Sequence, residues 1–418
     1  GLSQPRLDGA GSKQFPLAAN VLPQLWQNIG AQRPYPAQVV FLLGANPVFG
    51  NNECNRALEK VPFIVSFSSF MDESAWLADL ILPDHTYLER WQDDPTPVSV
   101  GIACLLGIRQ PVVEPLFDTM HTGDAMLRMA VKLEERVSQS FPWGNFEEVL
   151  KFSTAGIFHS GRGAIISGAF EESWFRFLRE RGWQYPLAAT FEEFWDQLVE
   201  AGGWWDPIYD FGERERVYET PSGKFEFFSQ NLKRELETHT LKIEPMGVPS
   251  SEFLLEELLA GLQIEARGDK VFMPHYEPPR IRGEVKNYPY VLNIYAPTAL
   301  AGRDGANEPL LLEMPGYLIN SNWESWVEIN PETASAHRLA EGDWVWVQSP
   351  RAKRKVRVKL SPGAMPGVVN IPFGLGHRMY GRYAKDRGIN PKELRGEEYD
   401  HLGGVAATQS TRVKIYKV

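Results

Sequence analysis

The tetrapeptide Gly44-Ala45-Asn46-Pro47 follows five apolar residues at positions 39–43. An apolar run that stops at a glycine is typical of a buried strand, and in an open α/β sheet ligands bind outside the carboxyl ends of the strands, where backbone N–H groups can meet phosphate. Gly44 permits close approach, and the amide of Asn46 can hydrogen-bond a base or a ribose. The alternative is a tight turn that uses Asn-Pro only for its backbone geometry.

A second apolar run, residues 61–67, leads into the sequence SFSSFMDESA. If the two runs pair as parallel strands, then Ser66, Ser68, Ser69 and Asp72 line the same crevice as the first loop. The alternative is a serine-rich turn in which Ser69 or Asp72 caps a short helix.

Near the C-terminus, the sequence NIPFGLGHRMYGRYAKDRGINPKEL has the composition of a ligand-facing loop. Its glycines allow close backbone approach, Arg378 and Arg382 offer anion contacts, and Asn390 offers an amide. The alternative is a long loop with surface arginines. His377, like the other histidines, is not at metal-ligand spacing, and this favours a hydrogen-bonded structural role.

Composition excludes several classes of protein. The formal net charge is −10, and the basic residues form no long stripe, so nucleic acid is not expected as a partner. The one basic run, residues 351–359, alternates with valine and is typical of the solvated face of a strand. Cys54 and Cys104 are far apart without a CxxC pattern, which argues against a zinc site, an iron–sulfur cluster or a disulfide scaffold in this chain.

The predicted secondary structure that positions these residues changes along the chain, from alternating strands and helices to strands alone. Residues 39–43, 52–60 and 61–67 predict a strand, a helix and a strand, hence a parallel sheet, and a brief third strand follows before Pro83. Further predicted elements are a helical region at 118–150 capped by Thr122 or Asp124, a turn and strand at 220–229, a helix at 252–264 and a linker at 265–287.

Beyond residue 288, six short runs rich in Val, Ile and aromatic residues are separated by Gly, Pro and Asp turns. Such a series closes most easily as a β-barrel. The predicted fold class is therefore α/β followed by all-β, with a partial doubly wound parallel sheet and a C-terminal barrel of six strands.

Five segments, taken in order, resemble the C-terminal half of molybdopterin oxidoreductases of the dimethyl sulfoxide reductase family. They are GANP, SFSSFMDESAWLADLILPDHTYLERW, TPSGKFEFFS, WVEINPETASAHRLAEGDWVWVQSP and GINPKEL. The resemblance covers residues 38–418. It implies three parts: residues 1–230 as the second part of the nucleotide-binding α/β domain with helical insertions, 231–287 as a helix and linker, and 288–418 as the dinucleotide-binding barrel.

In that family, molybdopterin guanine dinucleotide lies between α/β domains and the barrel. The resemblance assigns one guanine nucleotide to residues 44–47 and to the turn from Ser66 to Asp72. It places Tyr295, Thr298, His377, Arg382 and Asn390 at the pterins.

The [4Fe–4S] cysteine motif and the segment that delivers the molybdenum or tungsten ligand are missing from this sequence. The resemblance therefore implies a partner chain or segment with the N-terminal half of the fold, an iron–sulfur protein subunit and a membrane subunit that interacts with quinone. The chain would not be catalytic alone. By analogy, the complex would be attached to the cytoplasmic membrane, on its periplasmic or outer face.

One position departs from the family pattern. Relatives usually place an Asp where this chain has Ser68, and a hydroxyl is a poorer acceptor for guanine N–H groups. The sequence of these segments is similar to that of subunits of membrane-attached quinone reductases and alternative complex III. Some of those subunits have lost the cofactor. A cofactor-free structural subunit of a quinone-linked respiratory complex is therefore the alternative, and a binding module that docks through the acidic helix from Glu252 is a third.

Overall fold

A computed structural model describes residues 4–12, 14–95, 103–133, 135–161, 163–165, 188–207, 218, 220–241, 251–300, 305–319, 323–396 and 398–418. The chain forms two compact units. The first combines Gly1–Ile81 with Phe227–Val418, and the second is Leu82–Glu226. Among the described residues, no helix is both long enough and apolar enough to cross a membrane.

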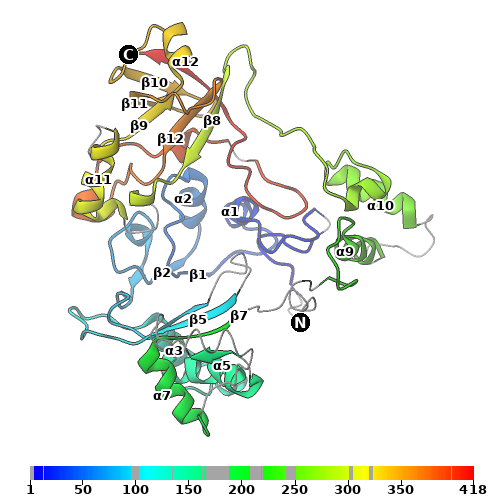
Figure 1. The fold of residues 1–418 in the computed structure, drawn as a ribbon, viewed down its shortest axis with the longest axis vertical. Coiled ribbons are helices and arrows are strands. Elements are labelled where there is room, and N and C mark those ends of the chain that lie inside the picture. Colours follow the sequence, from blue (N-terminus) through cyan, green and yellow to red (C-terminus); the bar gives the residue numbers. More distant parts are fainter. Residues whose placement is uncertain are drawn as a thin grey trace, which may run out of the picture. The chain divides into compact units, whose positions relative to one another are not determined.

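The N-terminal segment of the first unit is a small α/β layer (Figure 1). Its three parallel strands have the order β1-β2-β3, and they are β1 Val39–Leu42, β2 Phe63–Ser66 and β3 Leu80–Ile81. Helix α1, Leu22–Ala31, precedes β1, and helix α2, Asn52–Leu58, connects β1 to β2. The side chain of Asn51 caps α2 by accepting two backbone N–H bonds, which fixes where the loop after β1 ends. The predicted strand, helix and strand are confirmed.

Only one face of this sheet is covered. Leu42 and Ile64 pack with Trp26, Cys54 and Leu58 of the two helices. On the other face Val65 is buried, but four apolar side chains remain partly exposed among the described residues, and they are Val39 (47%), Phe41 (44%), Phe63 (42%) and Leu80 (41%). The expectation that residues 39–43 form a fully buried strand is therefore wrong for this chain. Strands of parallel sheets are usually covered on both faces, so this face lacks its normal cover.

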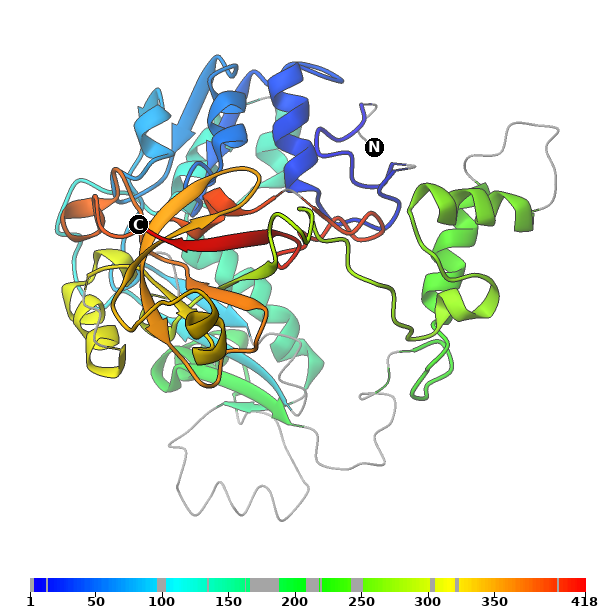
Figure 2. The same ribbon diagram turned by 90° about the horizontal axis from the view of Figure 1, so that it is seen from above.

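The C-terminal segment of the first unit is a closed six-stranded barrel with the order β10-β11-β9-β12-β8-β13. The strands are β8 Tyr290–Tyr295, β9 Trp326–Ile329, β10 Trp344–Gln348, β11 Lys353–Leu360, β12 Val368–Pro372 and β13 Arg412–Lys417. Every run that the sequence predicted as a barrel strand is found, coloured from yellow-green to red in Figures 1 and 2. Antiparallel and parallel pairs both occur.

Alternate residues of the barrel strands fill its interior. Leu292, Val345, Ile371 and Val413 are fully buried in a single core cluster, with the intervening residues facing outward. Strand β11 follows the same alternation, which confirms that the basic run is a solvated strand face. Closure leaves the barrel without free edges.

The first unit contains further helices around these two parts. They are η1 Ala75–Leu77, α9 Gln230–Leu241, α10 Ser251–Gly261, η3 Gly268–Phe272, η4 Thr298–Leu300, η5 Gly305–Asn307, α11 Pro309–Ile319, α12 Pro331–Ala336, α13 Gly381–Ala384 and η6 Pro391–Leu394. Leu258 and Leu259 of α10 are buried against Leu236 of α9. Since the apolar face of α10 is used inside the chain, the hypothesis of a helix for partner docking loses its basis.

The predicted strand at 220–229 is wrong. The turn is present, because the backbone N–H of Gly223 donates to the carbonyl of Thr220, and Thr220 Oγ1 donates to the carbonyl of Lys224. The residues that follow the turn form no strand up to α9. Phe225 and Phe227 alternate as a strand would, but both are largely exposed.

The second unit is a four-stranded antiparallel sheet with helices, in the order β4-β5-β7-β6. Its elements are β4 Gln92–Pro95, β5 Ala103–Arg109, α3 Thr122–Val131, α4 Glu135–Ser140, α5 Phe146–Ser160, β6 Ala164–Ile165, α7 Phe191–Ala201 and β7 Gly203–Pro207. Leu150, Phe194 and Trp204 form its core. The cap of α3 is His121, whose Nδ1 accepts the Gly123 N–H, and not Thr122 or Asp124.

Candidate functional site

The loop after β1 is bonded to the segment after β2. Gly44 adopts a left-handed backbone (φ 56°), which turns the chain out of the strand. Asn46 Oδ1 accepts hydrogen bonds from the backbone N–H (3.1 Å) and the hydroxyl (2.7 Å) of Ser74, and Asn46 Nδ2 donates to Glu73 Oε2 (2.7 Å). The two loops therefore meet at one edge of the sheet, but the Asn46 amide is engaged within the protein.

The serines and Asp72 after β2 bond to one another and to the backbone. The buried Ser66 hydroxyl accepts the Ser68 N–H (3.2 Å), and Ser68 Oγ donates to Asp72 Oδ2 (2.9 Å). Asp72 Oδ1 accepts the N–H groups of Ser74 (3.0 Å) and Ala75 (2.7 Å), at the start of η1. This is the role of a helix cap, which was the alternative interpretation of these residues.

Glu73 joins the α/β layer to the barrel. Its Oε1 accepts the backbone N–H groups of Arg378 (2.7 Å) and Met379 (3.3 Å), and His377 Nδ1 lies 3.1 Å from Oε2. Burial by itself raises the pKa of Glu73, but the hydrogen bonds from His377 and Asn46 outweigh it and lower the pKa to about 2. The carboxylate is thus ionised, and it holds two segments 304 residues apart in the sequence.

Aromatic rings surround this contact. The rings of Phe49 and His377 are stacked 3.6 Å apart with an angle of 8°, and the tilted ring of Tyr380 has its centre 4.8 Å from that of His377. Phe373 lies 5.5 Å from Phe49, and Lys392 Nζ lies 3.7 Å from the centre of the Phe373 ring. His377 therefore has one ring face and its Nδ1 occupied by the protein.

Two hollows adjoin the loop after β1, and they share Asn46, Phe49 and Lys392. The larger, of about 540 Å³, lies between α1, residues 41–53 and the barrel. The smaller, of about 160 Å³, is also lined by Asp72 and His377. Ligand pockets typically measure roughly 300–1,000 Å³, so only the larger hollow has the size of a ligand site.

Two donors near these hollows, Asn390 behind Gly50 and Lys392 in the lining, have no acceptor among the described residues. Asn390 is 3% exposed, and its Oδ1 accepts the Lys392 N–H (3.0 Å), while its Nδ2 has no hydrogen-bond partner among the described residues. Burial lowers the pKa of Lys392 to about 8, and the nearby positive charge of Arg395 adds to this effect. No described carboxylate forms an ion pair with Lys392.

Three of the residues that the resemblance placed at the pterins lie away from these hollows. The Tyr295 hydroxyl donates to Glu328 Oε1 (2.5 Å), and burial, together with that carboxylate, raises the pKa of Tyr295. Thr298 is exposed at the start of η4, and the Arg382 guanidinium lies 5.6 Å from the Tyr383 ring. By contrast, Ala45, Asn46 and Pro47 line the larger hollow, and Asn46, Asp72 and His377 line the smaller.

Sequence reasoning missed four residues of this region: Phe49, Gly50, Glu73 and Lys392. Each lies one to three positions from a chosen residue. Glu73 follows Asp72 directly, and Lys392 lies two residues after Asn390. No feature of the sequence showed that these charged side chains are buried.

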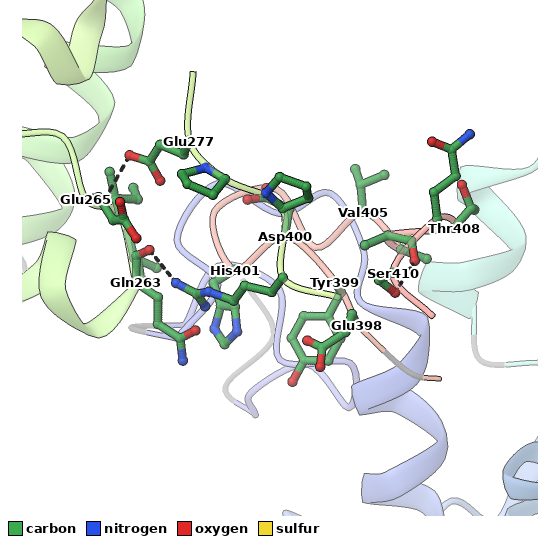
Figure 3. A pocket seen from close by; sticks show the side chains of 18 residues that line it. Gln263, Glu265, Glu277, Glu398, Tyr399, Asp400, His401, Val405, Thr408 and Ser410 are labelled. Atoms are coloured by element: carbon green, nitrogen blue, oxygen red, sulfur yellow. Dashed lines mark hydrogen bonds between the residues drawn. The ribbon is translucent and has the colours of Figure 1, made fainter. Parts of the chain in front are cut away.

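A separate hollow of about 540 Å³ lies beside the end of α10, lined by residues 262–265, 277–280, 398–401 and 405–410 (Figure 3). Glu277 Oε1 accepts the N–H groups of Glu265 and Ala266 (both 2.9 Å), and Arg280 donates to the carbonyl of Gln263 (2.7 Å). These polar groups hold the local turns together. In the part of the chain that the structure describes, no three His, Cys, Asp or Glu side chains gather as a metal site.

Comparisons with known proteins agree with this arrangement. Residues 17–118 match the family described as "Molybdopterin oxidoreductase", and residues 315–411 match "Molydopterin dinucleotide binding domain". The chain is 28% identical to the arsenate respiratory reductase molybdopterin-containing subunit ArrA of Shewanella sp. (strain ANA-3), over all of this chain and 50% of that protein.

Two further relatives extend the comparison. The menaquinone reductase, molybdopterin-binding-like subunit of Nitratidesulfovibrio vulgaris is 24% identical over 97% of this chain and 48% of that protein. The solved structure of acetylene hydratase from Pelobacter acetylenicus superimposes with a TM-score of 0.60 at 20% identity, covering 98% of this chain and 48% of that one. The chain thus spans about half the length of these relatives.

Proposed function

This chain belongs to the molybdopterin oxidoreductase family, and on that premise we propose that it forms one side of a molybdopterin guanine dinucleotide site in an oxidoreductase complex. The rest of the site is supplied by a partner chain or segment that carries the N-terminal half of the family fold. Residues 44–47, Asp72, His377 and Asn390 are the proposed contacts from this chain. Ser66, Ser68, Tyr295, Thr298 and Arg382 remain predicted contacts.

The observation that carries this proposal is the uncovered face of the β1-β2-β3 sheet. Val39, Phe41 and Phe63 are each more than 40% exposed on that face, while Leu42 and Ile64 on the other face are buried. Leaving so much apolar surface of a parallel sheet in water is unfavourable by about 25 cal/mol per Å². Since the chain covers about half of its relatives, the missing half is the proposed cover.

The residues on the barrel side fit a polar cofactor. Lys392, which is partly buried and pairs with no described carboxylate, lines the hollow of ligand size, and the buried Asn390 amide, which has no acceptor among the described residues, lies close to Gly50 in its wall. Buried donors of this kind are normally satisfied, so they favour a ligand that brings acceptor oxygens. When bound, such a cofactor supplies redox chemistry at molybdenum or tungsten, with the metal ligand and the [4Fe–4S] cluster held by the partner half.

One observation favours the second candidate, a cofactor-free structural subunit of a quinone-linked membrane complex. The Asn46 amide, the Ser68 hydroxyl and the Asp72 carboxylate are all bonded within the chain, and the cavity beside Asp72 measures only about 160 Å³. A guanine base would have to displace these contacts. The similarity to a subunit of a menaquinone reductase supports a quinone-linked setting.

Analysis of the intact complex separates the two candidates. The complex would be purified through a tag on this chain, assayed for molybdenum and tungsten, and then denatured to release nucleotides for chromatography. The proposal predicts metal at about one per assembly, together with a guanine nucleotide. A pure complex with neither would overturn it in favour of the structural subunit.

A further inference from the structure

The outer surface of strands β11, β10 and β13 carries cations and aromatic rings. These strands are consecutive in the barrel wall (Figure 1), and their inward residues belong to the buried core. Six outward residues make up a surface that we call the cationic face: Lys353, Lys355, Lys414, Trp344, Trp346 and Tyr416. Since a closed barrel has no free strand edge, a partner here must bind side chains and not the backbone.

Cross-strand pairing places the rings between the cations. Trp346 of β10 is directly opposite Lys355 of β11 on one side and Tyr416 of β13 on the other. Lys353 Nζ lies 4.7 Å from the centre of the Trp346 ring. Lys355 Nζ lies 4.9 Å from the centre of the Trp344 ring. Directly opposed side chains of antiparallel strands are close enough to touch, so these residues form one continuous surface.

The lysines of the cationic face are not neutralised by acids. Lys353, Lys355 and Lys414 form no ion pair with a carboxylate in the described part of the chain, whereas Arg357 beside them is paired with Glu324 (3.1 Å). The whole chain has a formal net charge of −10, so this positive region is a local exception. Such a region attracts an anionic partner to one face of an acidic protein and thereby orients the protein.

The residue types favour a lipid surface over a nucleic acid or a protein. Single-stranded nucleic acid stacks its bases on aromatic faces, but cations already lie over the Trp344 and Trp346 rings. Protein interfaces are depleted in lysine. Tryptophan and tyrosine beside lysine are typical of the headgroup level of a membrane, where the rings meet both apolar and polar surroundings and the ammonium groups meet phosphates.

We propose that the cationic face binds the anionic headgroups of a membrane surface, with its lysines at the phosphates and its aromatic rings at the headgroup boundary. The contact would hold this wall of the barrel against the lipid. The inference goes beyond the proposed function and does not depend on whether a cofactor is bound. It assigns a partner to the basic run at residues 351–359, which the sequence predicted only as the solvated face of a strand.

Sedimentation of the full chain with vesicles tests the proposal at low salt. The probes are vesicles of phosphatidylcholine mixed with phosphatidylglycerol, and vesicles of phosphatidylcholine alone. We expect binding to the anionic vesicles that weakens as salt screens the charges. The double variant Lys353→Gln/Lys355→Gln should bind about thirtyfold more weakly, because each lysine near an anionic surface contributes about fivefold. The matched control is Lys60→Gln/Lys385→Gln, which replaces two exposed lysines outside these strands and should bind nearly as wild type does.

Far-UV circular dichroism and urea denaturation establish that each variant folds. Trp346→Leu keeps the charge and removes a ring, so it should reduce the binding that survives at high salt, and unchanged binding there would overturn the role of the rings. No binding of wild type to the anionic vesicles, equal binding to both kinds of vesicle, or equal binding by the two double variants would overturn the inference. Binding of polyglutamate but not of vesicles would assign the face to an acidic protein and overturn it as well.

Discussion

The α/β layer and the barrel of the first unit differ in what they leave without a partner: the layer leaves apolar side chains exposed, and the barrel leaves polar groups without acceptors. In the α/β layer the polar groups at the strand ends are bonded to one another, but an apolar sheet face is exposed. In the barrel the apolar core is closed, but Asn390 Nδ2 has no acceptor among the described residues, and burial lowers the pKa of Lys392. The first region therefore needs an apolar partner, and the second needs a polar ligand.

This difference shows which part of the site is formed before any ligand binds. The contacts of Asp72 and Glu73 fix the shape of the α/β side, and they do so without an external group. The barrel side has the unfavourable groups that a bound anion would relieve. Substitutions on the α/β side should therefore destabilise the free chain, while substitutions on the barrel side should not.

The largest effect is expected for Glu73→Ala. It leaves the N–H groups of Arg378 and Met379, the Asn46 amide and His377 without their acceptor, and breaking such a buried set costs about 3–5 kcal/mol. Urea denaturation followed by tryptophan fluorescence measures the change. The control is Glu324→Ala, whose ion pair with Arg357 is exposed and contributes less than about 1 kcal/mol. Equal losses in the two variants would show that Glu73 does not join the regions.

The pH dependence of stability should identify the same carboxylate. The pKa of Glu73 is about 2 in the folded chain against 4.5 for an unperturbed glutamate, so its stabilisation is present above pH 4.5 and is lost as the pH falls towards 2. A shift of this size corresponds to about 3 kcal/mol. Glu73→Gln should remove that part of the acid loss. If wild type and Glu73→Gln lose stability in parallel, the carboxylate is not ionised as described.

On the barrel side we expect a substitution to change the free energy of unfolding in the opposite direction. Lys392→Met should raise the free energy of unfolding of the ligand-free chain by about 1–3 kcal/mol at pH 7, because it removes a partly buried cation that pairs with no described carboxylate. The pKa of Lys392 is lowered from 10.5 to about 8, so the penalty is complete below pH 8 and disappears as the pH rises to 10.5. Denaturation at pH 7 and pH 10 checks this, with Lys385→Met as the control. Destabilisation by Lys392→Met would mean that the lysine is already compensated.

The strands could be predicted because their signals are local. Alternating Val, Ile and aromatic residues between Gly and Pro turns gave all six barrel strands, and apolar runs ended by small residues gave β1 and β2. The same rule failed at residues 224–229, where Phe225 and Phe227 alternate but stay exposed. Alternation predicts a strand only where another element covers one face.

The site was predictable only in part, for a related reason. The meeting of the loop after β1 with the turn after β2 follows from parallel pairing, and it put Asn46 beside Ser74. The contact of Glu73 with residues 377–379 joins positions about 300 apart, and no local pattern records it. Burial of Lys392 depends on how the barrel loop packs, which a sequence motif does not show.

The smallest effect is expected on the exposed sheet face. Phe41 and Leu42 are neighbours on β1 that point to opposite faces, and Phe41 is 44% exposed while Leu42 is 5% exposed. Phe41→Ala should cost the free chain about 1 kcal/mol or less, whereas Leu42→Ala should cost about 2–5 kcal/mol through the cavity it leaves. Denaturation of both variants, alone and in the complex, measures the difference. If Phe41 lies under the missing half, its substitution should become as costly in the complex as that of Leu42, and an unchanged small cost there would show that nothing covers this face.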